Sequence, residues 1–323
     1  MSTFDIHVHI GGIDRRTTGC FMSHPQKIKL KKEMPGSLRW RFQIAEWLGL
    51  LDSQVKKRLF SFLNEGPVDY AVVLAMDGVY NRDGYLDEQR TNFYVPNEYV
   101  IGLAKECKKV IPGASIHPLR KEWEEEFERV VASGARLIKW LPSSQGFDPA
   151  DSRILPFYRK LAAKKIPLLV HTGFEHIIVA PSEQQVFGEP KRLNNALEAG
   201  VTVIMAHSGT SGGPGEPEYW NDFIELARRY PHCYGDMAAF THWTRVGILP
   251  KIIHHDWVHE RLIHGSDATL QPSLDQISGL VGRDLAERLK SSQNPIYKDW
   301  KLKKALGFPN EIFTRAGRLL RLD

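Results

Sequence analysis

The sequence predicts an α/β fold, a (β/α)8 TIM barrel that occupies residues 1–323 as a single domain. Three observations lead to this prediction. Short apolar runs rich in β-branched residues recur along the chain, and eight of them can be counted. Segments with helical spacing separate these runs, which is the alternation typical of parallel α/β proteins. Several runs end in residues that bind metals or carry protons, as the strand ends of barrel enzymes do.

The apolar runs have the character of buried parallel strands. Continuous stretches such as 167–170 and 201–205 are typical of strands that are covered on both faces. A doubly wound open sheet is the alternative, but it calls for a glycine-rich first turn with GxGxxG spacing, which residues 9–12 do not supply. The predicted strands are Phe4–Ile10, Tyr70–Met76, Ala114–His117, Arg136–Leu141, Pro167–His171, Val201–His207, Cys233–Met237 and Leu262–Asp267.

Helices are predicted between the strands from spacing and end signals. Ile154–Lys165 carries apolar residues at helical spacing. The helix Leu193–Glu198 ends shortly before Gly200, a residue suited to the left-handed position after a helix. A capping box that begins at Ser273 predicts one helix running to Lys290.

The chain is longer than the roughly 250 residues that a minimal barrel needs. The surplus lies in the first β-to-α connection, residues 11–68, which contains a predicted helix Leu38–Leu63, and in a C-terminal helical extension, residues 290–323. Because β-to-α loops lie on the active-site face, the long insertion is a candidate lid. Arg39 and Arg41 on it could meet an anionic substrate, although most arginines on such a helix are solvated.

Composition limits the classes of partner. With 42% hydrophobic residues, 25% charged residues and a net charge of +5, the chain is globular and lacks the dense basic stripe of a nucleic-acid binder. Three widely spaced cysteines suggest no disulfide framework. We see no signal peptide and no apolar run of about 20 residues to cross a membrane, so we expect a cytoplasmic protein. Aromatic residues such as Trp40, Phe42 and Trp300 would cover the barrel or make a contact in a homo-oligomer.

The first predicted strand carries the most informative motif, Asp5-Ile-His7-Val-His9. Side chains alternate along a strand, so His7 and His9 point to the same face, with Asp5 behind them. Two imidazoles on one face of a strand end can bind one divalent cation. The motif is weak by itself in a chain with thirteen histidines.

The ends of later strands strengthen this prediction. Strand C-termini of a barrel converge on one mouth, and alternation puts Lys139 in phase with Leu137 and His171 in phase with Leu169. Imidazoles and a carboxylate together favour Zn²⁺, with Mn²⁺ or Fe²⁺ as alternatives. In chain order the strand-end residues are His7, His9, His117, Lys139, His171, His207 and Asp267.

With this ordered set, the chain resembles the amidohydrolase superfamily, and within it the amidohydrolase-related branch of metal-dependent TIM-barrel hydrolases, which also contains decarboxylases. The resemblance runs nearly end to end. It rests on the segments 5–9 (DIHVH), 138–151, 168–173 (LLVHTG), 205–209 (MAHSG) and 264–267 (HGSD). Trp140 departs from the histidine that often follows the lysine of the fourth strand.

The resemblance implies a ligand set. His7, His9, His171 and Asp267 would bind the primary metal. His207 would bind a second metal, or would act as an acid/base residue that polarises the substrate where only one metal is present. We expect one ion rather than two.

The role of Lys139 depends on whether its amine is carboxylated. A carboxylated Lys139 would bridge two metals, as in some branches of the superfamily. Unmodified, it has donors only and would bind a substrate carboxylate, or simply extend to the solvent at the barrel mouth. Trp140, His176 and His117 are further candidates for substrate binding, and Asp236 is as consistent with a structural role as with a place in the pocket.

The pattern favours a metal-dependent hydrolase that cleaves a C–N or C–O bond of a small molecule. Water activated by the metal would attack, and Asp267 would serve as general base and then as general acid. The alternative is a metal-dependent non-oxidative decarboxylase or C–C hydrolase on the same scaffold, since fold and ligands do not separate these reactions. A phosphoesterase or nuclease and a non-catalytic metal-binding protein are less favoured.

Overall fold

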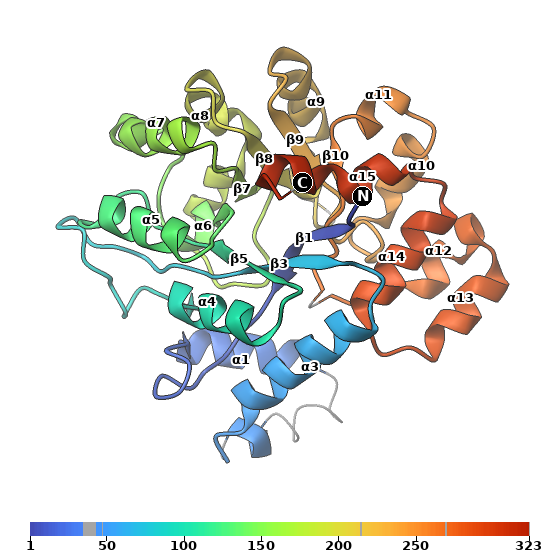
Figure 1. Ribbon diagram of the computed structural model, residues 1–323, viewed down its shortest axis with the longest axis horizontal. Helices are drawn as coiled ribbons and strands as arrows, with labels where there is room; N and C mark the ends of the chain where they lie inside the picture. Colours follow the sequence, from blue (N-terminus) through green and yellow to red (C-terminus); the bar gives the residue numbers. More distant parts are fainter. Residues whose placement is uncertain (35–42, 47, 214, 269, 323) are drawn as a thin grey trace.

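A parallel barrel forms the body of the protein. The computed structural model describes residues 1–34, 43–46, 48–213, 215–268 and 270–322. In this part of the chain, the main sheet has eight strands in the order β1-β3-β5-β6-β7-β8-β9-β10. The first and last strands meet through backbone bonds, since the amide of Ile6 donates to the carbonyl of His264 at 3.1 Å. Figure 1 shows the helices outside this ring of strands, which confirms the predicted (β/α)8 barrel.

The barrel strands are short and apolar, as predicted. Their inward side chains, among them Leu137, Leu169 and Ile204, form one buried cluster with Ala316 and Leu320 of the last helix, which therefore covers one end of the barrel. The strands are β1 (Phe4–His9), β3 (Tyr70–Leu74), β5 (Val110–Ala114), β6 (Leu137–Trp140), β7 (Leu168–His171), β8 (Val203–Ala206), β9 (Cys233–Asp236) and β10 (Leu262–Ile263).

The third barrel strand differs from its prediction. Ala114–His117 was expected, but β5 begins at Val110 and ends at Ala114. Proline and glycine usually signal a turn, and residues 112 and 113 are Pro and Gly. Here Gly113 lies within the strand, where it pairs with Leu74 of β3 and Leu137 of β6, and a Cβ at this position would come 2.6 Å from Leu74 Cδ2. His117 consequently lies in the loop after the strand.

Helices surround the barrel on the outside. Apolar side chains on their inner faces pack against the outer faces of the strands. Every described helix is too short or too polar to cross a lipid bilayer. The helices are α1 (His24–Glu33), α3 (Leu51–Glu65), α4 (Asn97–Glu106), α5 (Trp123–Ala132), α6 (Pro142–Gln145), α7 (Leu155–Lys164), α8 (Asn194–Glu198), α9 (Trp220–Arg229), α10 (Leu249–Ile252), α11 (Asp256–His259), α12 (Leu274–Val281), α13 (Arg283–Lys290), α14 (Pro295–Ala305) and α15 (Asn310–Leu320).

Two of the helix predictions are confirmed and one is wrong. Helix α7 matches Ile154–Lys165, and α8 is followed by Gly200 at a φ of +82°. The single helix expected from Ser273 to Lys290 is instead two helices, because Gly282 adopts a φ of +89° between them. The side chain of Ser273 makes no capping bond.

The predicted helix Leu38–Leu63 lies partly outside the described residues. Its described residues are helical at 43–46 and in α3, and a turn at 48–50, with Gly49 at a φ of +65°, precedes α3. Arg39, Arg41, Trp40, Phe42 and Trp47 are outside the described residues.

The insertion after β1 is anchored to loops that follow other strands. Its strand β2 (Phe21–Met22) pairs antiparallel with β4 (Phe93–Tyr94). The buried side chain of Gln26 on α1 donates to the carbonyl of Ile177 at 2.8 Å and accepts from the amide of Val179 at 2.7 Å. The insertion thus lies against the loop that follows β7.

The C-terminal extension contains α14 and α15 and is bonded to two strand ends. Lys303 of α14 is fully buried. Its Nζ donates to the carbonyls of Met237 and Gly265, each at 2.8 Å, and to Asp299 Oδ2 at 2.6 Å. These carbonyls directly follow β9 and β10, so α14 fixes the backbone on which two strand-end carboxylates are placed.

Candidate metal centre

The two histidines of β1 lie together at the mouth of the barrel. Their Nε2 atoms are 3.0 Å apart, and His7 is fully buried while His9 keeps a partly exposed side chain. Asp5 behind them accepts from the amides of His7 at 3.1 Å and of Ser266 at 2.9 Å. This carboxylate ties the end of β1 to the loop after β10.

Asp236 at the end of β9 sets the orientation of His7. Its Oδ2 lies 2.7 Å from His7 Nδ1, and its Oδ1 accepts from the amide of His207 at 2.7 Å. A proton on Nδ1 leaves the Nε2 of His7 with a free lone pair, the arrangement that metal-binding histidines generally have. Burial lowers the pKa of His7 well below its usual value, so the ring is neutral.

Asp267 approaches the same two histidines from the loop after β10. Its amide donates to the carbonyl of His7 at 2.9 Å, and its Oδ1 lies 3.7 Å from His9 Nε2. Within the described residues, one ligand atom from each of His7, His9 and Asp267 can be chosen so that all lie within 4.8 Å of one another. Two imidazoles and a carboxylate so close together are a donor set that suits a divalent metal.

Burial dominates the electrostatics of Asp267. Removal from water raises the pKa of its carboxyl group to about 7, against the opposing charges of Lys139 and Arg245. The residue also has a φ of +59°, and His207 has a φ of +60°. Non-glycine residues in this region carry strain and concentrate at functional sites.

His171 and His207 extend the cluster from β7 and from the turn after β8. Their ring centroids are 5.0 Å apart, and the ring of His207 is 5.4 Å from that of His7. His207 Nδ1 lies 3.1 Å from the carbonyl of Ala238, which leaves its Nε2 free. The nitrogens of His171 face Phe174 O at 3.2 Å and Glu175 Oε2 at 3.4 Å.

Lys139 points into the barrel mouth from β6. Its side chain is fully buried, and its Nζ lies 3.3 Å from His7 Nε2. Burial lowers the pKa of this amine to about 8. Five strand ends therefore bring His7, His9, Lys139, His171, His207 and Asp267 into one cluster.

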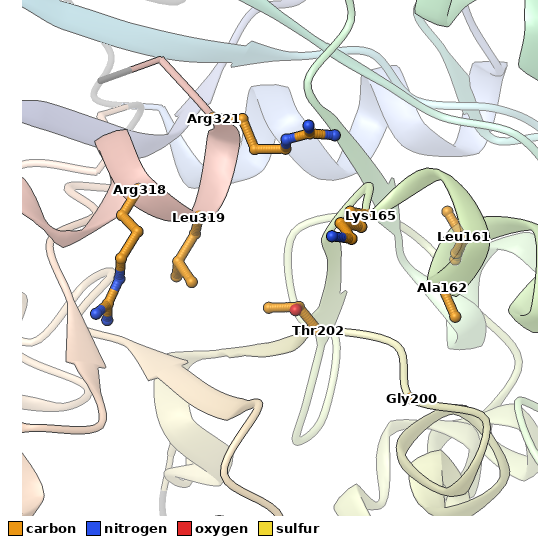
Figure 2. Close-up of a pocket in the computed structure, with 8 residues that line it drawn as sticks. All are labelled: Leu161, Ala162, Lys165, Gly200, Thr202, Arg318, Leu319 and Arg321. Carbon is orange, nitrogen blue, oxygen red and sulfur yellow. The ribbon is translucent and has the colours of Figure 1, made fainter.

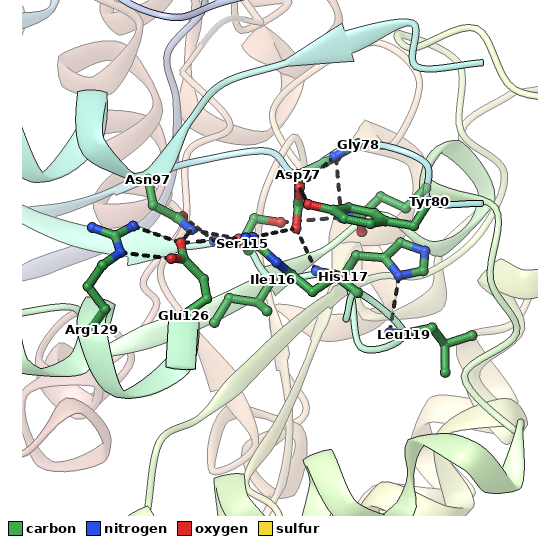
Figure 3. A network of polar contacts seen from close by, with 12 residues as sticks. Asp77, Gly78, Tyr80, Asn97, Ser115, Ile116, His117, Leu119, Glu126 and Arg129 are labelled. Atoms are coloured by element: carbon green, nitrogen blue, oxygen red, sulfur yellow. Dashed lines mark hydrogen bonds and ion pairs between the residues drawn. The ribbon is translucent and has the colours of Figure 1, made fainter. Parts of the chain in front are cut away.

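His117 and His176 lie apart from this cluster. The ring of His117 packs between Tyr80 and Phe147, at centroid distances of 4.9 and 4.8 Å, and its amide donates to the buried Asp77 (Figure 3). His176 is exposed at the rim and pairs with Glu216. Both follow barrel strands, but within the described residues neither makes a hydrogen bond, ion pair or ring contact with the histidines above.

The structure does not support a place for Trp140 in the site. Strand alternation turns its side chain outward, opposite to that of Lys139. The indole is fully buried, donates to the carbonyl of Ile116 at 2.7 Å, and packs on Phe157 and Tyr158 of α7. Trp140 thus joins the barrel to its helical layer.

We expect Trp140→Ala to lower the free energy of unfolding by about 3–5 kcal/mol, because it removes a large buried side chain and leaves a cavity. Denaturant unfolding measures this. Trp243→Ala is the matched control, since that side chain is 55% exposed and its loss should cost less than about 0.5 kcal/mol. Equal stabilities for the two variants would contradict the packing role.

A cavity of about 250 Å³ lies at the opposite end of the barrel (Figure 2). Lys165 and Thr202, which line it, precede β7 and β8, whereas the histidines follow the strands. Arg318 and Arg321 of the C-terminal extension complete its basic side. This cavity is separate from the candidate metal centre.

Sequence reasoning missed two residues of the site. Glu175, in the loop after β7, is buried beside His171. Arg245, nine residues after the end of β9, is buried near Asp267 and His207. Neither lies at a strand end, so no periodic signal marks them.

Comparison with protein families identifies the chain. A family model described as amidohydrolase matches residues 43–301, which is well over half of the sequence. The chain belongs to the amidohydrolase family. The match includes Lys139, His171, His207 and Asp267, and it begins after His7 and His9.

Solved structures share the fold of this amidohydrolase. An uncharacterized TIM-barrel protein from Bordetella bronchiseptica is 14% identical, with a TM-score of 0.58 over 95% of this chain and 100% of that one. A probable 2-pyrone-4,6-dicarboxylic acid hydrolase from Acinetobacter baumannii, with citric acid bound, is 13% identical, with a TM-score of 0.56 over 100% of both chains.

A third neighbour of the amidohydrolase is a decarboxylase. The 2,6-dihydroxybenzoate decarboxylase from Rhizobium is 12% identical, with a TM-score of 0.53 over 100% of this chain and 99% of that one. A search of curated proteins gave no match. At these identities the structural neighbours establish the fold only.

Proposed function

We propose that this amidohydrolase is a metal-dependent hydrolase of a C–N or C–O bond in a small molecule. The observation that carries the proposal is the convergence of His7, His9 and Asp267 within 4.8 Å at the barrel mouth, with His171 and His207 beside them. The amidohydrolase family, to which this chain belongs, contains hydrolases and decarboxylases, which is consistent with the proposal. The structural neighbour named as a 2-pyrone-4,6-dicarboxylic acid hydrolase is consistent with it as well.

The residues present fit a divalent metal. His7, His9 and Asp267 would hold it, and His171 is the fourth ligand that the family resemblance implies. The imidazoles are neutral because burial lowers the pKa of His9 to about 3 and that of His171 to about 4. When bound, the metal would supply Lewis acidity and lower the pKa of water toward about 7.

The side chains around this position suit proton transfer. Asp267 brings a carboxylate to the proposed metal position, so it fits a general base that takes a proton from the attacking water and later returns it as a general acid. The Nδ1 proton of His207 is held by the carbonyl of Ala238, so its free Nε2 would accept a hydrogen bond from the attacking water. The buried Lys139 would hold an anionic group of the substrate.

A metal-dependent decarboxylase or C–C hydrolase is the second candidate. The neighbour named as a 2,6-dihydroxybenzoate decarboxylase favours it, and so do two buried cations, Lys139 and Arg245, close to the metal position. Product analysis separates the two functions. Release of CO₂ from a carboxylic acid substrate would favour decarboxylation, and its absence during turnover would favour hydrolysis.

We also propose that residues 11–68 act as a lid. The bonds from Gln26 to the loop at Ile177 and Val179 support this role, because they connect the insertion to a loop that directly follows a ligand-bearing strand.

We expect protein purified without added metal to carry about one equivalent of a divalent metal per chain, with Zn²⁺ as the expected ion and Mn²⁺ or Fe²⁺ as alternatives. Elemental analysis measures the metal, and intact mass shows whether Lys139 is carboxylated. Two equivalents with a carboxylated Lys139 would replace the one-ion proposal by a two-ion one. Protein that stays metal-free even after reconstitution would contradict the proposed function.

A further inference from the structure

The cavity opposite the candidate metal centre is basic and has no compensating carboxylate (Figure 2). Lys165, Arg318 and Arg321 line it, and its described lining includes no aspartate or glutamate. Within the described residues, the side chains of these three cations form no ion pair and no hydrogen bond. Three cations around one cavity of about 250 Å³ create a positive potential that attracts an anion.

Two helix ends contribute negative charge to the same cavity. Lys165 directly follows α7, and Arg321 directly follows α15. A helix C-terminus carries roughly half a negative charge, so the two ends together offset about one of the positive charges. The helix ends therefore favour cations at this place, but they leave an excess of about two positive charges in the cavity.

The backbone at two of the cations has a conformation that usually calls for glycine. Lys165 has a φ of +54° and Arg321 a φ of +57°. At other helix ends with a positive φ this chain has glycine, namely Gly134, Gly146, Gly200, Gly282 and Gly307. The other described non-glycine residues with a positive φ follow β8, β9 and β10 at the barrel mouth, and they are His207, Ser208, Ala239 and Asp267. Such residues concentrate at functional sites, which here are the candidate metal centre and this cavity.

The rest of the lining suits a small organic group. Leu161, Ala162 and Leu319 supply apolar surface beside the cations. The hydroxyl of Thr202 also faces the cavity and makes no hydrogen bond with another described residue. The cavity thus combines an excess of positive charge with a polar group and an apolar wall.

We propose that this cavity binds a small molecule that carries a phosphate group. A phosphate monoester has a charge of about −1.5 to −2 near pH 7, which matches the excess of positive charge. The guanidinium groups of Arg318 and Arg321 present paired N–H donors that suit phosphate oxygens. The apolar wall would contact the organic part of the ligand.

This ligand is distinct from the substrate of the metal centre. Strands β7 and β8 run from the cavity toward His171 and His207, and each has four residues, a length of about 13 Å. Between the two ends, the barrel is filled by the buried cluster that includes Leu169 and Ile204. A molecule in the cavity therefore does not reach the metal position, and the inference does not depend on the proposed function.

Calorimetric titration at low ionic strength tests the proposal. The probes are inorganic phosphate and glycerol 3-phosphate, with glycerol as the uncharged counterpart, each titrated into metal-loaded and metal-stripped protein. We expect the two phosphates to bind to metal-stripped as well as metal-loaded protein, and glycerol to bind to neither. Lys165→Gly and Arg321→Gly should each weaken phosphate binding by about 2- to 5-fold, and the double variant by about 10-fold or more.

Lys164→Gln is the matched control. It removes one positive charge next to Lys165, but its side chain pairs with Glu128 and does not line the cavity, so this variant should bind phosphate as the wild type does. Undiminished binding in the double glycine variant would overturn the inference. An equal weakening in Lys164→Gln would do so as well, because it would reduce the effect to net charge. Phosphate binding that requires the metal, or a wild type that binds neither phosphate, would also overturn it.

Thermal unfolding separates binding from a structural role. Glycine adopts a positive φ without strain, so both glycine variants should keep the melting temperature of the wild type within about 3 °C. A large fall in melting temperature together with unchanged phosphate binding would assign Lys165 and Arg321 to the fold and overturn the proposed site.

Discussion

Asp267→Asn is expected to lower turnover by about two to four orders of magnitude while the barrel remains folded. The amide is nearly isosteric with the carboxylate, and the backbone bond from residue 267 to the carbonyl of His7 does not depend on the side chain. What disappears is a carboxylate that can take a proton from the attacking water and return it. The amide cannot do either.

Turnover of Asp267→Asn is measured on the first substrate found in a panel of esters, amides, lactones and carboxylic acids. Metal content is measured on the same preparation, because the amide is also a poorer ligand. Asp275→Asn serves as the control, since the side chain of Asp275 is 88% exposed and lies on α12. Near-normal turnover of Asp267→Asn with full metal content would remove Asp267 from the role of general base.

His7→Ala is expected to weaken metal binding by at least about 100-fold, more than the loss of an outer-shell partner typically does. The substitution removes one of the proposed metal ligands and leaves Asp236 buried without its imidazole partner. The second effect also lowers stability, so His9→Ala is the companion variant, because His9 is partly exposed and has no such carboxylate behind it.

Metal titration of the stripped proteins measures the effect of these histidine variants. His254→Ala is the control. His254 is exposed and lies in the segment between β9 and β10, so this variant should bind metal as the wild type does. If His7→Ala and His9→Ala each bound one equivalent of metal with the affinity of the wild type, the histidines of β1 would not be ligands.

The sequence predicts those parts of the site that follow from strand periodicity. Alternation along β1, β6 and β7 suffices to bring His7, His9, Lys139 and His171 to one mouth, and the structure places them there. The same alternation argues against Trp140, whose neighbour Lys139 already takes the inward position. Whether these residues bind metal remains a prediction.

The rest of the site depends on tertiary structure. From the sequence, Asp236 is equally consistent with a structural role and with a place in the pocket. The structure shows that its carboxylate orients His7, because the ends of β9 and β1 lie close together. Arg245 lies in an irregular loop, where no period relates sequence position to direction. Pro112 and Gly113 carry turn signals, yet both pair with residues of β3 and are part of a strand. In each case a neighbour distant in sequence decides the outcome.

The bonds of Lys303 have a consequence for biosynthesis. The lysine holds the carbonyls of Met237 and Gly265, and both belong to backbone that carries site carboxylates. On the ribosome, most of the barrel emerges before α14 does. During that interval the last strand ends lack this support, and Asp299 and Thr241 cannot yet pair. The candidate metal centre is therefore completed late, once α14 has left the ribosome, and a partly synthesised barrel would not yet hold all the candidate ligands in place.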